Sequence, residues 1–94
     1  MSLPHPAQHA DVSGDGIVKA SAGQVVAVHL TAAATTATLI LYDNASAASG
    51  TVLAQLSAPT LETVSFCPAI PYVATAGIYA DITGTGANAT VVFL

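Results

Sequence analysis

Few side chains in this sequence can do acid–base or nucleophilic chemistry, and their spacing brings none of them together. Four of the five acidic residues lie in or beside turn signals, and the set is Asp11, Asp15, Asp43, Glu62 and Asp81. Enzymes need paired carboxylates, a nucleophile beside its base, or a metal with its ligands. The sequence therefore predicts a protein that is not an enzyme, with no catalytic residue and no cofactor.

Two patterns have residue types that bind metals. His5 and His9 are four residues apart, as on one face of a helix, but Pro6 between them disfavours a helix. Residues 11–16, DVSGDG, have the spaced oxygen ligands and glycine of a calcium loop. They lack its closing glutamate, and Asp-Gly is a common turn signal. We interpret this stretch as a turn and expect no metal site.

Cys67 is the only cysteine, so no disulfide can form within the chain. A catalytic thiol needs a histidine or another group that stabilises its thiolate, and the sequence places none beside it. We expect a buried thiol that behaves as a small hydrophobic side chain.

The composition combines 53% hydrophobic residues with only 6% charged residues. Soluble domains usually carry about 25% charged residues. Ala, Thr, Ser and Gly must therefore cover most of this surface, which suits permanent packing against neighbouring subunits; the alternative is a small, weakly charged soluble domain. The net charge is −4 with Lys19 as the only basic residue, which excludes nucleic acid and an anionic membrane surface as partners.

Residues 1–12 are predicted to be an extended N-terminal arm, because Pro4 and Pro6 disfavour a helix. We expect this arm to order only against a partner, by strand addition or along a groove. The first ten residues lack the basic start and apolar run of a signal peptide, and no run approaches the ~18 apolar residues of a membrane span. These features predict synthesis in a cytoplasm.

Residues 13–94 are predicted to form one all-β domain built around the stretch 37–56, in which two β-rich runs flank a Ser/Ala/Gly loop. Seven to eight short strands are expected, at 17–20, 24–31, 38–42, 51–56, 61–67, 72–74, 77–83 and 89–94. Turn signals at this spacing predict a small antiparallel β-sandwich, jelly-roll-like or Greek-key. The expected core is Val26, Val28, Leu30, Leu39, Leu41, Val64, Phe66, Ile78 and Ile82.

The central block TLILYDNASAASGTVLAQL resembles small β-rich structural proteins of tailed bacteriophages. The opening GIVKASAGQVVAVHL, the proline-broken FCPAIPY and the ending GIYADITGTGANATVVFL support the resemblance, which covers residues 13–94. The resemblance implies a virion component, such as a capsid decoration (cement) protein or a head-fibre module. It carries over no catalytic residue.

The expected function is therefore capsid decoration, in which the chain packs on the major capsid shell and stabilises it by added contacts between subunits. The alternatives are a tail, neck or head-fibre module, and a non-catalytic glycan- or ligand-binding module. The expected partners are the major capsid protein or another virion protein, together with further copies of the chain in a homo-oligomer. The expected assembly interface is Leu3, Pro4, Pro6, His29, Thr38, Ile40 and Tyr42.

Overall fold

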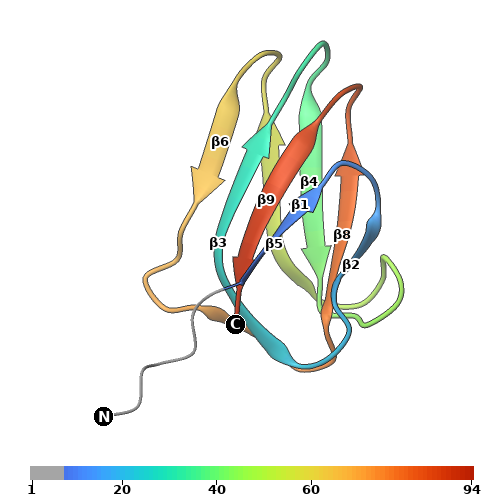
Figure 1. The fold of residues 1–94 in the computed structure, drawn as a ribbon, viewed down its shortest axis with the longest axis vertical. Helices are drawn as coiled ribbons and strands as arrows, with labels where there is room; N and C mark the ends of the chain where they lie inside the picture. The colour runs from blue at the N-terminus through green and yellow to red at the C-terminus, as the bar shows by residue number, and fades with distance from the viewer. Residues whose placement is uncertain (1–7) are drawn as a thin grey trace.

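Short runs of β-branched and aliphatic residues, separated by Gly, Pro, Asn and Ser, divide the chain into strands. The computed structural model describes residues 8–94, and these residues form nine strands (Figure 1). The strands are β1 (Gln8–Val12), β2 (Gly16–Lys19), β3 (Gly23–Thr31), β4 (Ala37–Tyr42), β5 (Val52–Ala58), β6 (Thr63–Phe66), β7 (Tyr72–Ala74), β8 (Ile78–Thr83) and β9 (Asn88–Phe93). In this part of the chain no helix has the length and apolar character to cross a bilayer.

The strand pairing is that of one long antiparallel ribbon rolled up on itself. Its tip is the β4–β5 hairpin; outward from the tip, β3 pairs with β6 and β7, β2 with β8, and β1 with β9. Rolling adds the pairs β3–β9 and β4–β8. The result is a sheet with the order β1-β9-β3-β6, with β7 also on β3, facing a sheet with the order β2-β8-β4-β5 (Figure 1). This arrangement confirms the predicted small antiparallel β-sandwich, and of the two predicted topologies, jelly-roll-like or Greek-key, the rolled ribbon corresponds to the first.

Strand β1 differs from the sequence prediction, which assigned residues 8–12 to an arm that orders only against a partner. In the structure all five of these residues pair with β9, from Gln8 opposite Phe93 to Val12 opposite Ala89. The reason is an apolar–polar alternation that turns Ala10 and Val12 inward, and Val12 is buried. The arm residues Leu3, Pro4 and Pro6 lie outside the described residues.

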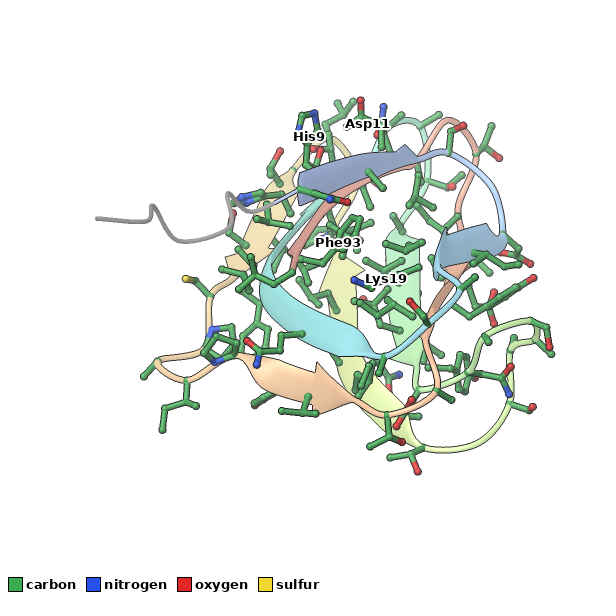
Figure 2. All side chains as sticks on the ribbon, turned by 60° about the horizontal axis from the view of Figure 1, so that its bottom comes forward. His9, Asp11, Lys19 and Phe93 are labelled. Carbon is green, nitrogen blue, oxygen red and sulfur yellow. The ribbon has the colours of Figure 1, made fainter. Side chains whose placement is uncertain are left out.

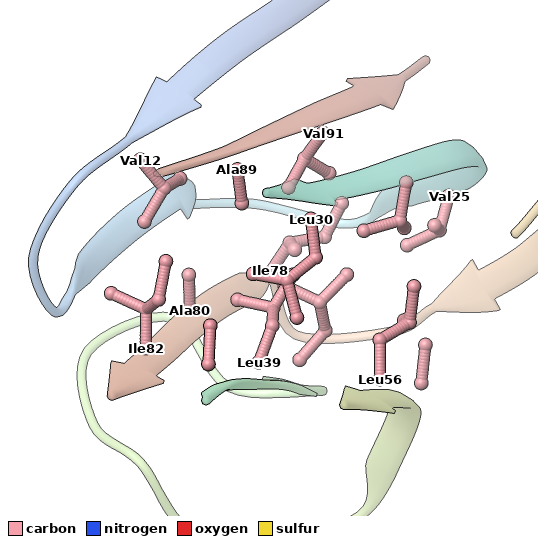
Figure 3. Packing of buried hydrophobic residues seen from close by; sticks show 14 of the residues in the cluster. Val12, Val25, Leu30, Leu39, Leu56, Ile78, Ala80, Ile82, Ala89 and Val91 are labelled. Atoms are coloured by element: carbon pink, nitrogen blue, oxygen red, sulfur yellow. The ribbon is translucent and has the colours of Figure 1, made fainter. Parts of the chain in front are cut away.

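The core lies between the two sheets, where aliphatic side chains of both inner faces interdigitate (Figure 3). Six of the predicted core residues are buried, namely Val28, Leu30, Leu39, Leu41, Ile78 and Ile82. The prediction that Val26 belongs to the core is wrong. A β-bulge between Val25 and Ala27 shifts the register of β3, so Val25 is buried in its place.

Strand β6 accounts for the other differences from the predicted core, because it lies at a sheet edge. Its inward residues Val64 and Phe66 pack on the core but stay half-buried. Cys67 is exposed rather than buried, since it follows Phe66 and alternation turns it away from the core.

The carboxylate of Asp43 clamps the connection between β7 and β8 onto the end of β4. It accepts hydrogen bonds from the Thr75 amide at 3.0 Å, the Thr75 hydroxyl at 2.9 Å and the Ala76 amide at 2.8 Å. These donors, the Ala76 amide above all, lower the pKa of Asp43 from 3.8 to about 2. Asp43 is therefore a structural group whose hydrogen bonds join segments 32 residues apart.

Candidate interaction surface

The outer face of the four-stranded sheet carries an apolar row that crosses all four strands. Ile17 of β2 is opposite Tyr79 of β8, Tyr79 is opposite Tyr42 of β4, and Tyr42 is opposite Val52 of β5. The tyrosines in the middle are half-buried, whereas Ile17 and Val52 at the ends are 54% and 49% exposed. Side chains opposite one another in antiparallel strands are ~5 Å apart, so the row forms a continuous apolar ridge. This ridge is exposed to solvent unless a partner covers it.

A second row lies two residues further along the strands and adds one charged position. Here Asp81 of β8 is opposite Ile40 of β4, and Ile40 is opposite Gln55 of β5. The third row is Thr83, Thr38 and Ser57, which are neutral. Most of this outer face is therefore uncharged, and its carboxylate lies toward the β2–β8 edge.

Asp81 has a second carboxylate beside it. Asp15, in the turn before β2, lies close to the Asp81 side chain and accepts a hydrogen bond from the Ile82 amide at 2.9 Å. Partial burial, and then the charge and hydrogen bond of Asp15, raise the pKa of Asp81 above its ordinary value. The two acids come from a turn and a strand that are far apart in the sequence, so local pattern alone could not pair them.

The outer face of the five-stranded sheet is different, because hydrogen bonds between its own side chains satisfy its polar groups. One row runs from Asp11 through Thr90 and His29 to Ser65. The Thr90 hydroxyl donates to Asp11 at 3.1 Å, and His29 Nδ1 is hydrogen-bonded to the Ser65 hydroxyl at 2.8 Å. Asp11 projects from β1 on the outside of this sheet, as its neighbour His9 does (Figure 2).

The residues predicted for the assembly interface therefore separate into groups. Thr38, Ile40 and Tyr42 lie together on the outer face of the four-stranded sheet, as their alternation with Leu39 and Leu41 predicts. His29 points away from the core, as expected, but it lies on the outer face of the other sheet. Sequence reasoning missed Ile17 and Val52, because only the strand register shows that they extend the row.

A groove of about 420 Å³ opens between the edge strands β5 and β6, where the rolled ribbon leaves the two sheets apart. Phe66 and Tyr72 form part of its wall, with ring centroids 5.6 Å apart. The lining is uncharged, and it consists of Leu53, Ala54, Gln55, Leu56, Ser57, Val64, Ser65, Phe66 and Tyr72. The lining has no carboxylate, imidazole, amine or thiol, so the Tyr72 phenol and two serine hydroxyls are its only groups that could act as acid, base or nucleophile.

Residues 8–94 contain no group of three side chains placed to hold a metal ion. In the turn that resembles a calcium loop, Asp11 bonds Thr90 and Asp15 bonds the Ile82 amide. Among the described residues, the outer face of the four-stranded sheet is therefore the strongest candidate for a functional site. A β-face that bears tyrosine and isoleucine and is uncharged apart from Asp81 is suited to association with another protein.

Comparisons of the chain with models of known protein families, with curated proteins and with solved structures gave no match.

Proposed function

We propose that this chain is a structural protein of a tailed-bacteriophage virion, made in the host cytoplasm, and specifically a capsid decoration protein. It packs on the major capsid shell and stabilises that shell by added contacts between subunits. The observation that carries the proposal is the outer face of the four-stranded sheet, where the row Ile17, Tyr79, Tyr42 and Val52 lies exposed or half-exposed. Only 6% of the residues are charged, so few charged side chains surround this apolar face, and it favours contact with another protein over exposure to water.

The size of this face favours a lattice partner over a single free one. Four strands ~4.8 Å apart and three outward rows ~6.7 Å apart make a face of ~400 Å². A stable one-to-one interface buries ~800 Å² on each partner. One contact of this kind is weak, but linked copies in a homo-oligomer that bind a repeating shell multiply it.

The fold supports the same function by analogy. Double-sheet jelly rolls are common in viral capsid proteins, but they also occur in lectins and cupins, so the fold alone does not select one function. The alternative within the virion is a tail, neck or head-fibre module, which would use the same face against a different neighbour.

Two matched variants test the proposal. Ile40→Lys places a charge in the middle of the proposed face, and Val92→Lys places one on β9, an interior strand of the other sheet, on that sheet's outer face. Both residues are half-buried and point away from the core. The assay is co-sedimentation of each purified variant with capsid particles of the same genome that lack this protein.

The proposal predicts that wild type and Val92→Lys bind the particles and that Ile40→Lys binds at least ~10-fold more weakly. The longer, charged side chain in the middle of the face disrupts its apolar contact with the shell, and its ammonium group pairs with Asp81 on the neighbouring strand rather than with the shell. Equal binding of the two variants would remove this face from the interface. Absence of wild-type binding would refute the capsid proposal itself.

A further inference from the structure

We infer that the partner of the four-stranded sheet is a different protein, which presents a lysine or arginine beside an apolar ridge, and that Asp15 and Asp81 receive this cation. The inference rests on the proposed function, in which this face docks on a virion protein. It adds the chemistry of the partner surface and excludes a second copy of the chain from this face.

The position of the two acids carries the first step. Asp81 is two residues from Tyr79 on the same face of β8, and it is opposite Ile40 on β4. Asp15 lies against it from the turn before β2 and is fixed by the Ile82 amide. A partner that covers the apolar row must therefore also cover or border this pair. The pair forms a negative corner on an otherwise neutral face.

Electrostatics then defines what the partner must supply. Covering carboxylates without giving them a counter-charge costs free energy, because the protein loses their hydration and gains nothing in return. Two neighbouring carboxylates already disfavour each other's ionised form, which is why burial and Asp15 raise the pKa of Asp81. An ammonium or guanidinium group from the partner reverses both effects. The two acids alone do not form a metal site, since the described residues bring no third ligand to them.

A second copy of this chain cannot supply that cation. Lys19 is the only lysine or arginine of the sequence, and the described histidines, His9 and His29, lie on the outer face of the other sheet. Its Nζ lies 6.0 Å from the centroid of the Phe93 ring, and Phe93 is a buried core residue (Figure 2). Two copies joined through this face would each bury an acidic pair without a counter-charge, whatever their relative orientation. The homo-oligomer proposed above must therefore use other surfaces.

The test uses the double variant Asp15→Asn/Asp81→Asn. Asparagine keeps the shape of the side chain and an oxygen that accepts from the Ile82 amide, so the fold is expected to be retained. The matched control is Asp11→Asn, an exposed carboxylate on the outer face of the other sheet. Binding of each variant to capsid particles of the same genome that lack this protein is measured at 50 mM and 500 mM NaCl.

The double variant is expected to bind ~3–10-fold more weakly than wild type at 50 mM NaCl, the loss typical of one or two partly exposed ion pairs. At 500 mM NaCl the difference should largely disappear, because salt screens such pairs. Asp11→Asn should bind as wild type does. Wild-type binding matched by the double variant at low salt would overturn the inference and leave the proposed function intact.

Sedimentation velocity of the chain alone provides the second measurement. The inference predicts that Ile40→Lys leaves the oligomeric state of the isolated chain unchanged. A wild-type dimer that Ile40→Lys converts to monomer would show that a second copy occupies this face, and would overturn the inference. Absence of wild-type binding to particles would overturn the proposed function, and the inference with it.

Discussion

Replacing Leu41 by alanine tests the assignment of the inner and outer faces on which the interaction surface depends. Leu41 is fully buried in β4, an interior strand of the four-stranded sheet. Its neighbours across the sheet are Ala80 of β8 and Ala54 of β5. These methyl groups cannot move far enough to fill the space of a lost isobutyl group, so the cavity should remain.

Deletion of a buried leucine costs ~2–5 kcal/mol of unfolding free energy, and the cost rises with the volume of the cavity that remains. We expect Leu41→Ala to fall in the upper part of this range, at ~3–5 kcal/mol. Each kcal/mol lowers the melting temperature of a domain of this size by ~4–8 °C, so the loss should exceed ~12 °C. Urea unfolding measures the free energy directly, provided that the m value is unchanged.

The matched control for Leu41→Ala is Ile40→Ala, which removes a side chain of equal size from the opposite face of the same strand. Ile40 is half-buried, so its loss should be only ~1 kcal/mol. If Leu41→Ala fails to fold, Ile78→Val provides a milder perturbation of the same core, with an expected cost of ~0.5–1.5 kcal/mol. A loss below ~1 kcal/mol for Leu41→Ala, or a larger loss for Ile40→Ala, would show that the two faces are inverted.

Three further changes test local parts of the structure. Asp43→Asn should lower the melting temperature at pH 7, because the variant loses the ionised carboxylate that the Thr75 and Ala76 donors stabilise. The pKa of Asp43 is about 2 in the folded protein and ~3.9 in the unfolded chain, so the difference in melting temperature between wild type and variant should be complete above pH ~4 and narrow as the pH falls toward 2. A difference in melting temperature that does not depend on pH would show that the charge of Asp43 does not cause it. Leu61→Gly should raise the free energy of unfolding by ~0.5–1 kcal/mol in urea, because Leu61 has a φ of 62°, which costs an L-residue ~1–2 kcal/mol and costs glycine nothing. Part of this gain is lost, since glycine makes the unfolded chain more flexible. A lower free energy of unfolding for the variant would show that Leu61 is not strained. Val12→Ala should cost ~1–3 kcal/mol whereas Asp11→Ala costs under ~0.5 kcal/mol, and equal small effects would mean that β1 does not belong to the sheet.

Local pattern predicted most of the strands, because alternation and turn residues act over a few positions. The run at Thr38, Ile40 and Tyr42, opposite Leu39 and Leu41, predicted both faces of β4 correctly. Strand β1 was missed because the prolines at 4 and 6 outweighed the weak alternation of Ala10 and Val12 in the prediction.

Features that depend on strand register could not be predicted from local pattern. The bulge that exchanges Val25 for Val26 arises from the pairing of β3 with β9, more than 60 positions further along the chain. The apolar row likewise requires the register of four strands, and the meeting of Asp15 with Asp81 requires β8 to lie beside β2. Composition indicated a surface suited to packing, but only the sheet order locates that surface.

If this chain is a component of a virus particle, as we propose, it must be found in a protein inventory of purified particles. Particles produced from the genome that encodes the chain are purified by density gradient and quantified by mass spectrometry. We expect the chain to be present in a copy number comparable to that of the major capsid protein. Its absence from particles in which the major capsid and tail proteins are all detected would refute the proposed function.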